Sequence, residues 1–358
     1  MEVAVLGAGN GGCAVAYDWA RAGHTVRLCA TREYPGETTA VGERGEIVCT
    51  GHEAGTAPIA YAGVDAERAV SGAELIFVVS PAYATEALAA AAAPHLSPGQ
   101  DVVVCPTTCL GSLAFRRAAG LSHDDARFTV AETSTLPYAV RITGPAEINI
   151  FLKLRAGMGC AASPGSETVR LTTALSEVYP GMTASGSVLA TTLQNGNPVI
   201  HPAVTLSNAA RIDGTDGDFF FYEDGVTPAV GRLMQAVDKE RIAIAAAYGQ
   251  TILPDPVMGI TQGYMIEDNY DTGYSTAPGF LGIKAQSSLD NRYLTEDVGY
   301  TLVLFTELAR VAGVPTPTMD AVIKIASVLL DRDFAADPPR SLQSLGLDGL
   351  DVAALHAI

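Results

Sequence analysis

The sequence predicts a doubly wound α/β domain followed by a mainly α-helical domain. An apolar run at the amino end opens into a glycine-rich turn and a helical pattern, and further apolar runs alternate with helices through the first half. From about residue 186, long amphipathic helical segments replace this alternation. Because 358 residues are many for a single core, we assign 1–185 to a Rossmann-type domain and 186–358 to a helical domain.

The glycine-rich turn indicates a dinucleotide site. "VAVL" at 3–6 is typical of a buried strand, and "GAGNGG" follows it at 7–12 before a helix begins, which is the context that G-x-G-x-x-G requires. Gly7 permits the tight turn, Gly9 lets the backbone approach a pyrophosphate, and Gly12 lets the helix pack closely. A merely structural glycine turn is the alternative. The predicted cofactor-binding residues of this turn are Gly7, Ala8, Gly9, Asn10, Gly11 and Gly12.

Further strand-length runs complete the first domain. They are "TVRLCA" at 25–30, "ELIFVVSPA" at 74–82, "DVVVCP" at 101–106 and "FTVAET" at 128–133, and a helix follows the second of them to about residue 93. Alternation of this kind predicts a mostly parallel sheet. Pro81, near the end of the second run, joins the predicted cofactor-binding residues.

The residues that follow the predicted strand at 25–30 bear on the choice of cofactor. An acidic residue usually stands there to bind the ribose 2′-hydroxyl of NAD. This chain has Thr31 and Arg32, with an acid only at Glu33. Thr31 can donate to a 2′-phosphate and Arg32 can pair with it, so we predict NADP(H). The alternative is that Arg32 is solvated and Glu33 binds NAD.

The bulk composition excludes several classes of partner. The 39 acidic and 22 basic residues give a formal charge of −17, which argues against nucleic acids and anionic membranes. The sequence contains neither a secretory signal nor an apolar run of about 18 residues, so no membrane helix is expected. Its scattered cysteines lack a usual zinc spacing. We therefore expect a cytoplasmic protein with reduced thiols and no metal.

The second half contains amphipathic helices and one long connection. One helix closes at Gly249, another spans about Thr295 to Ala312, and a third starts at Pro317 with Thr316 as its N-cap. Residues 249–290, rich in Gly, Pro, Asp and Tyr, are predicted to be a loop. A connection of that length inside a compact domain is usually functional.

A histidine between two prolines stands out in "LQNGNPVIHPAVTL". In a helix, Asn197 and His201 project from the same face because they are four residues apart. Pro198 and Pro202 each lack an N–H, so we expect two lost hydrogen bonds and a bent helix. A hydrogen-bonded, inert core histidine is the alternative.

A second cluster, "LDNRYLTEDVGY", supplies groups that a catalytic histidine could use. Thr295 can cap a helix whose first turn holds Asp297, where the helix dipole favours a carboxylate. Arg292 lies five residues before that aspartate. A histidine, an orienting aspartate and a carboxylate-binding arginine are typical of carbonyl- or imine-reducing dehydrogenases. The alternative for Arg292 is a surface ion pair.

These motifs together resemble the opine dehydrogenase family, which includes octopine and nopaline dehydrogenases. The resemblance covers essentially the whole chain and includes "VLGAGNGG", "AETSTLPYAVR", "NGNPVIHPAVTLSNAAR", "SLDNRYLTEDVGYTLV" and "SLQSLGLDGL". It implies reductive condensation of an amine, foremost an L-amino acid, with a 2-oxo acid through an imine. It also implies a helical domain like that of 6-phosphogluconate dehydrogenase and an active site in the interdomain cleft.

By this resemblance, His201 is the general acid/base and Asp297 orients it. Arg292 binds a substrate carboxylate, and Asn197 faces the nicotinamide or the substrate. The partners implied are small molecules, with a homodimer as the assembly considered. "MIEDNYDTGYSTAPGF" in the loop matches no family pattern, which leaves the amine open. The alternatives are a simple 2-oxo or hydroxy acid dehydrogenase of the same plan and a non-catalytic nicotinamide-binding sensor.

Overall fold

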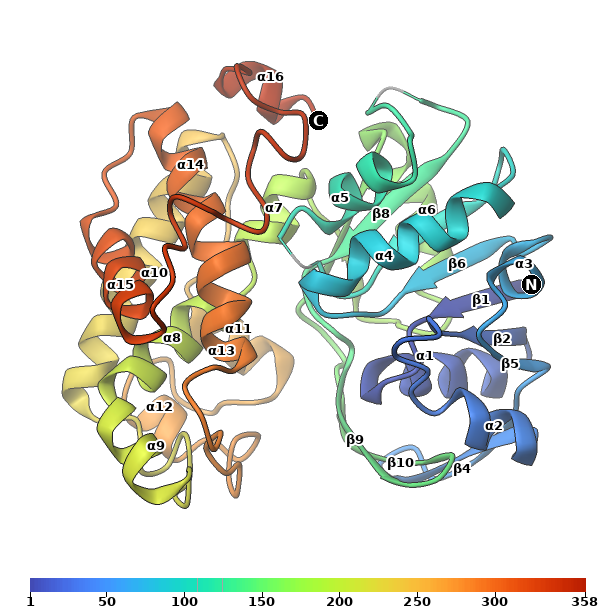
Figure 1. Ribbon diagram of the computed structural model, residues 1–358, viewed down its shortest axis with the longest axis horizontal. Helices are drawn as coiled ribbons and strands as arrows, with labels where there is room; N and C mark the ends of the chain where they lie inside the picture. The colour runs from blue at the N-terminus through green and yellow to red at the C-terminus, as the bar shows by residue number, and fades with distance from the viewer. Residues whose placement is uncertain (108, 124) are drawn as a thin grey trace. The chain divides into compact units, whose positions relative to one another are not determined.

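The computed structural model describes residues 1–107, 109–123 and 125–358 (Figure 1). The chain divides into two compact units, Met1–Thr191, which also takes in Ile358, and Thr192–Ala357. The division falls inside helix α7 (Val188–Leu193), a little beyond the position at 185/186 taken from the sequence.

Within the described residues, an eight-stranded sheet runs through the first unit in the order β12–β11–β8–β7–β6–β1–β2–β5. Neighbouring strands pair in parallel except β11 and β8, which are antiparallel. The mostly parallel sheet predicted from the sequence is therefore confirmed. Its strands are β1 (Glu2–Leu6), β2 (Thr25–Cys29), β5 (Tyr61–Gly63), β6 (Leu75–Val78), β7 (Asp101–Val104), β8 (Thr129–Thr133), β11 (Met158–Ser163) and β12 (Met182–Ala184).

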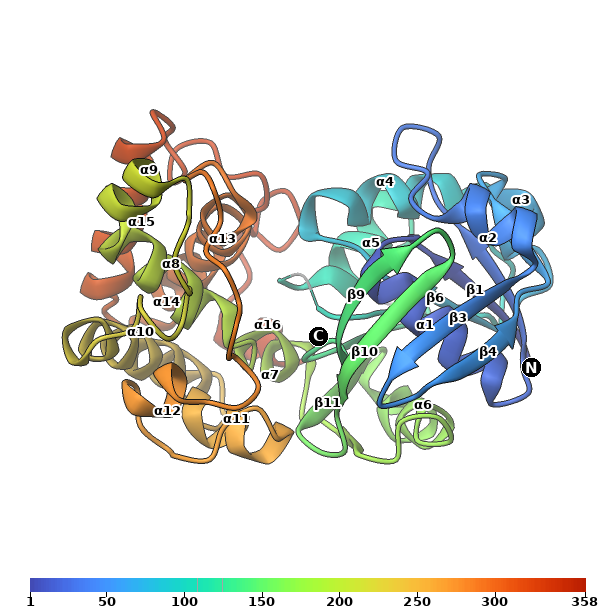
Figure 2. The ribbon, with the colours of Figure 1, turned by 90° about the horizontal axis from the view of Figure 1, so that it is seen from below.

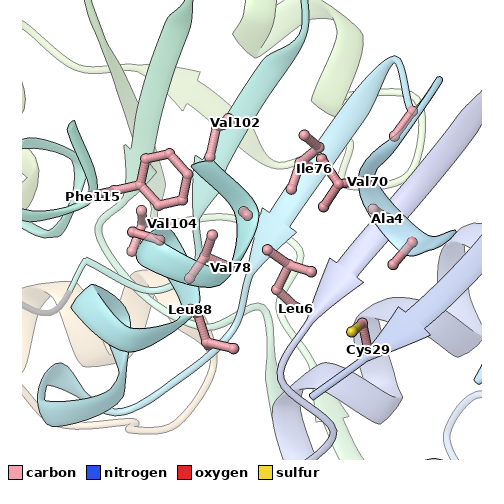
Figure 3. Packing of buried hydrophobic residues seen from close by; sticks show 14 of the residues in the cluster. Ala4, Leu6, Cys29, Val70, Ile76, Val78, Leu88, Val102, Val104 and Phe115 are labelled. Carbon is pink, nitrogen blue, oxygen red and sulfur yellow. The ribbon is translucent and has the colours of Figure 1, made fainter. Parts of the chain in front are cut away.

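The central strands are buried on both faces, which is why they consist of continuous apolar runs rather than alternating ones. Leu88 and Phe115 from the helices on one face pack with Val78 and Val104 of the sheet in one hydrophobic cluster (Figure 3). The helices and short 3-10 turns of this unit are α1 (Asn10–Arg21), α2 (Thr38–Arg44), α3 (Ala66–Val70), α4 (Ala82–Ala92), η1 (Ala93–His95), α5 (Gly111–Ala118), η2 (Gly165–Glu167), α6 (Thr168–Leu175) and α7.

A second, mixed sheet covers the outer side of α1, and the sequence analysis did not predict it. Its order is β4–β3–β10–β9, with β3 and β10 parallel and the outer pairs antiparallel. Helix α1 contacts both sheets and lies between them, so its residues Gly12–Ala20 are buried (Figures 1 and 2). The strands are β3 (Glu46–Gly51), β4 (Gly55–Pro58), β9 (Tyr138–Gly144) and β10 (Glu147–Lys153).

A buried polar network fastens α1 to the second sheet. The Asp18 carboxylate lies 2.6 Å from the Lys153 ammonium and accepts a hydrogen bond of 2.6 Å from the Tyr138 hydroxyl. Because the Tyr138 hydrogen goes to Asp18, the Tyr138 oxygen accepts from the Tyr179 hydroxyl 3.0 Å away, and Tyr179 itself accepts from the Trp19 indole N–H. Because a buried charge is tolerated only when it is paired and hydrogen-bonded, this network fixes α1 and with it the glycine turn at its start.

The second unit is helical, as predicted; in the part of the chain that the structure describes, its β pairing is an isolated bridge between Phe220 and Lys284. Helix α8 contacts α10, α13, η3 and α15 and is buried from Pro198 to Thr205. None of the described helices is long and apolar enough to cross a membrane. The elements are α8 (Asn197–Ser207), α9 (Ala209–Thr215), α10 (Pro228–Ala247), α11 (Asp255–Gln262), α12 (Thr272–Ser275), α13 (Arg292–Thr295), the π-helix η3 (Asp297–Leu302), α14 (Val303–Ala312), α15 (Pro317–Leu329) and α16 (Val352–His356).

The predicted helix start at Thr295 is wrong. Asn291 is the N-cap, since its side chain accepts from the Tyr293 N–H, and α13 begins at Arg292. The helix then widens into a π-turn, in which the Thr301 N–H reaches the Glu296 carbonyl five residues back. An asparagine caps a helix at least as well as a threonine, and it comes first in the chain. Asp297 therefore opens a π-turn, a feature common at functional sites.

The structure also differs from the sequence prediction in the segment 249–290 and at the start of α15. The segment 249–290 is not a plain loop, because it contains α11 and α12. Thr316 does precede α15, but its side chain makes no capping bond. The Glu240 carboxylate of α10 accepts instead from the N–H groups of Thr318 and Met319. A side chain from a neighbouring helix has replaced the local cap.

Candidate active site

The glycine turn of the first unit has the shape that a dinucleotide needs. Gly7 has φ +110°, and a Cβ there would lie 2.1 Å from the Val79 carbonyl oxygen. A Cβ on Gly12 would lie 1.8 Å from the Gly7 carbonyl oxygen. Around Gly9, by contrast, a Cβ would meet no described atom within 4 Å. Gly7 and Gly12 are thus required by packing, and Gly9 leaves one side of the turn open for a ligand to approach.

The other residues of the turn hold it in place. The Asn10 side chain accepts a 2.7 Å hydrogen bond from the Ile142 N–H, which ties the start of α1 to β9. Ala8 is buried, and its carbonyl accepts from the Glu37 N–H. A Cβ on Gly11 would approach the Val79 side chain to 3.0 Å. These contacts hold the turn against the neighbouring segments, and the Gly7 N–H donates to the Cys29 carbonyl at 2.7 Å.

A pocket of about 280 Å³ lies at the carboxyl ends of β1 and β2. This is the edge of a parallel sheet where open α/β folds bind ligands. Pro81 is in the N-cap position of α4, the helix that supplies the apolar wall. The lining includes Leu6, Ala87, Leu88 and Ala91 on the apolar side and Thr31, Arg32 and Glu33 after β2.

Thr31, Arg32 and Glu33 are the polar side chains of this pocket. The Thr31 hydroxyl oxygen accepts from the Tyr34 N–H at 3.2 Å and keeps its own hydrogen for donation. Arg32 and Glu33 are both exposed. All three residues that the sequence singled out for cofactor choice line the same pocket: Thr31, Arg32 and Glu33.

In the second unit, His201 and Asp297 meet. The Nδ1 atom of His201 on α8 lies 2.8 Å from Oδ2 of Asp297 on η3. The two residues are only 7% and 2% exposed. An ionised carboxylate can only accept, so the imidazole donates from Nδ1–H and its Nε2 becomes the basic nitrogen.

The prolines act differently from the prediction that both disrupt the helix. Pro198 lies in the first turn of α8, where its missing N–H would have no helical partner, so it costs nothing. Only Pro202 is inside the helix, where it deprives the Pro198 carbonyl of a bond. Asn197 is the first residue of α8, half-buried and one turn before His201. Pro198 therefore favours the start of α8, and His201 lies in the second turn of that helix.

Arg292 does form an ion pair, the alternative considered for it. Its Nε lies 3.1 Å from Oε2 of Glu296, four residues along, and its side chain is 52% exposed. Arg292 opens α13, which leads directly into the turn that bears Asp297. About half of the Arg292 side-chain surface is exposed to solvent at the start of α13.

Three aromatic residues surround His201, and the sequence analysis missed them. Tyr293 stacks on the imidazole with a centroid distance of 3.9 Å, and Phe221 meets it edge-on at 6.1 Å. The Tyr222 hydroxyl lies 3.3 Å from Nε2. Tyr293 adjoins Arg292 and could have been suspected, but "FFFY" at 219–222 reads as ordinary core sequence.

Asp255 is another buried acid near this site. Burial raises its pKa to about 6, and the neighbouring Asp238 carboxylate adds to the rise. Tyr274 donates to Oδ2, and a Cβ on Gly196 would clash with Oδ1, so the carboxyl group lies against the backbone that leads into α8. The sequence offered no signal for it beyond its place in the segment 249–290.

Known proteins match both parts of the chain. Residues 184–330 match the family model described as NAD/NADP octopine/nopaline dehydrogenase, alpha-helical domain, and residues 2–106 match NADP oxidoreductase coenzyme F420-dependent. An opine dehydrogenase of Arthrobacter sp. (strain 1C) is 35% identical, over 99% of this chain and 97% of its own length.

Solved structures show the same fold. Octopine dehydrogenase in complex with NADH and agmatine has a TM-score of 0.82 at 21% identity, covering 99% of this chain and 97% of that one. Yersinopine dehydrogenase with NADP⁺ bound has a TM-score of 0.72 at 16% identity, covering 100% and 97%. These comparisons confirm the resemblance seen in the sequence: the chain belongs to the opine dehydrogenase family of NAD(P)-dependent oxidoreductases acting on CH–NH bonds, whose general activity is the reductive condensation of an amine with a keto acid.

Proposed function

We propose that this protein uses NADPH to condense an amine, foremost an L-amino acid, with a 2-oxo acid through an imine. His201 serves as general acid/base and Asp297 orients it. The observation that carries the proposal is the buried 2.8 Å contact between these two side chains, which come from helices 96 residues apart in the chain. An inert core histidine has no need of a buried ionised partner, which is costly to desolvate.

The first unit fits the cofactor. The open side of the turn at Gly9 and the N-terminus of α1 suit a pyrophosphate, and the pocket beside β2 suits an adenosine. When bound, the cofactor supplies the hydride that reduces the imine. Thr31 and Arg32 would hold a 2′-phosphate, the former by donation and the latter by charge, and this supports NADPH over NADH.

The protein's part in the amine chemistry is to move protons. Amine addition requires a neutral nucleophile, so Nε2 of His201 takes a proton from the substrate ammonium. The imidazolium that forms lies against the Asp297 carboxylate and is stabilised by it. The same nitrogen then returns its proton to the hydroxyl group that leaves as water. Because both residues are buried, few bulk water molecules compete for these protons.

Arg292 and Asn197 would position the substrates. The Arg292 guanidinium can bind a carboxylate bidentately while Glu296 keeps it in place along α13. Asn197, one turn before His201, offers an amide that can donate and accept near the same reacting groups. Both assignments follow from position and residue type.

A matrix of amines against 2-oxo acids tests the function. NADPH oxidation is followed for each pair, and the products are identified by mass. We expect oxidation only when an amine and a 2-oxo acid are both present, with a secondary-amine product. Oxidation with the 2-oxo acid alone would indicate a simple hydroxy acid dehydrogenase. Intact NADPH binding without turnover across the panel would indicate a nicotinamide sensor.

A further inference from the structure

Tyr222 contacts the nitrogen of His201 that Asp297 leaves open. Its hydroxyl lies 3.3 Å from Nε2, and Tyr222 is only 5% exposed. With Nδ1–H donated to Asp297, neutral His201 presents Nε2 as an acceptor, so the Tyr222 O–H donates to it. The basic nitrogen of the proposed acid/base is therefore joined to a tyrosine hydroxyl.

The residues around His201 leave Nε2, the nitrogen beside Tyr222, as the position where the ring can take up a proton. Asp297 occupies the Nδ1 edge of the ring, Tyr293 covers one face at 3.9 Å, and Phe221 approaches edge-on. The His201 residue as a whole is 7% exposed. Tyr222 thus stands on the Nε2 side, where a substrate proton has to arrive.

An aromatic stack holds Tyr222 in this orientation. Its ring lies on Phe280 with a centroid distance of 4.3 Å and an interplanar angle of 13°. Phe280 stacks in turn on Tyr264 at 5.5 Å and on Tyr274 at 6.0 Å. These three rings belong to the segment 249–290, and Tyr274 and Phe280 lie in its stretch "MIEDNYDTGYSTAPGF". The segment 249–290 therefore holds the Tyr222 ring in place beside His201.

We propose that Tyr222 relays the proton between the reacting amine and Nε2 of His201, a step that rests on the proposed function. An amine N–H bond breaks as a new O–H bond forms on Tyr222, while the original Tyr222 O–H bond breaks as Nε2–H forms. No electron leaves either partner, and Tyr222 is a neutral phenol before and after. The return path runs in reverse, from the imidazolium through Tyr222 to the hydroxyl group that departs as water.

The electrostatics of Tyr222 agree with a concerted relay. Burial raises its pKa well above the ordinary value, and Tyr293, Asp255 and Asp297 nearby raise it further. A free phenolate is thus strongly disfavoured. A hydroxyl that cannot stay ionised can still pass a proton on, since it donates one hydrogen while it accepts another.

Tyr222→Phe tests the relay, with Tyr248→Phe as a matched control. Tyr248 is another buried tyrosine of this unit, and its hydroxyl donates to the Leu308 carbonyl at 2.9 Å. We expect Y222F to lower kcat by about 10² to 10⁴, the range for one proton-transfer group, with KM values within about twofold. Y248F should keep wild-type kcat. In mixtures of H₂O and D₂O, the rate of the wild type should follow two protons in flight and that of Y222F one.

A measurement that does not depend on turnover accompanies the kinetics. In enzyme with ¹⁵N-labelled histidine, the Nε2 signal of His201 should shift in Y222F and stay unchanged in Y248F. An unchanged signal in Y222F, or a kcat within twofold of wild type, would overturn the relay while leaving the condensation intact. A wild-type enzyme that never consumes NADPH with an amine and a 2-oxo acid would instead overturn the proposed function together with the relay.

Discussion

Replacing Asp297 by Asn keeps the size of the side chain and removes its charge. The carboxylate lies 2.8 Å from His201 Nδ1, and the two residues are 2% and 7% exposed, so solvent screens the pair only slightly. A hydrogen bond to a charged group is worth about 1.5–3 kcal/mol. If the imidazolium loses that stabilisation in the rate-limiting step, kcat falls by about 10- to 150-fold, since about 1.36 kcal/mol corresponds to a factor of ten.

A second effect of D297N acts in the same direction. The amide can turn its N–H₂ toward Nδ1, which would favour the tautomer with the proton on Nε2. An imidazole in that form cannot take a proton from the substrate at Nε2. NADPH affinity should stay at the wild-type value, because the predicted cofactor-binding residues all belong to the other unit.

Initial rates of NADPH oxidation at saturating amine and 2-oxo acid measure the loss. Asp290→Asn is the control, because Asp290 is an exposed acid of the same segment that pairs with Arg332 at 2.9 Å. D290N should retain wild-type kcat. A D297N enzyme within threefold of wild type, or one that loses no more than D290N, would refute the orienting role of Asp297.

Three further substitutions test the catalytic histidine, the choice of cofactor and the buried acid Asp255. His201→Ala should cut kcat by about 10² to 10⁴ with NADPH affinity unchanged, and near-wild-type turnover would exclude it as the acid/base. Arg32→Ala should weaken NADPH far more than NADH in fluorescence titrations, whereas equal losses would contradict the NADP assignment. Asp255, whose pKa rises from 3.8 to about 6 on folding, makes the folded state bind more protons than the unfolded state between these values. The contribution of Asp255 to the free energy of unfolding is therefore full below about pH 4 and is lost as the pH rises through about 6. The free energy of unfolding changes by up to about 3 kcal/mol over this interval. In Asp255→Asn the pH dependence of urea unfolding should flatten over that interval; a slope like that of the wild type would show that Asp255 titrates normally.

Much of the first unit could be predicted because its signals are local. The apolar run before Gly7, the glycine spacing and the helix that follows are contiguous, and their packing follows from the absence of a Cβ at Gly7 and Gly12. The second sheet was not predicted. Its strands β3 and β10 pair across about 100 residues, and their need for burial arises only because α1 presents a second apolar side to them.

The helix start before Asp297 shows where local rules compete. Thr295 and Asn291 are both acceptable N-caps, and the choice depends on whether the chain can fit an additional residue into the π-turn at η3. Likewise, Thr316 was a reasonable cap for α15 until the carboxylate of Glu240 came within reach from α10. Such choices depend on neighbours that are distant in the chain.

The sequence by itself determined the glycine turn, the parallel sheet, the helical second unit and the family, since each is encoded in contiguous residues or in motifs that can be compared directly. It also placed Asn197 and His201 one helical turn apart. Only the tertiary structure decided that His201 meets Asp297 across 96 residues, that Tyr222 lies at Nε2 and that Asp255 is buried beside them. The physical reason is that hydrogen bonds and pKa shifts depend on distances of a few ångströms between side chains, and those distances are set by the packing of α8 against η3 and its neighbours.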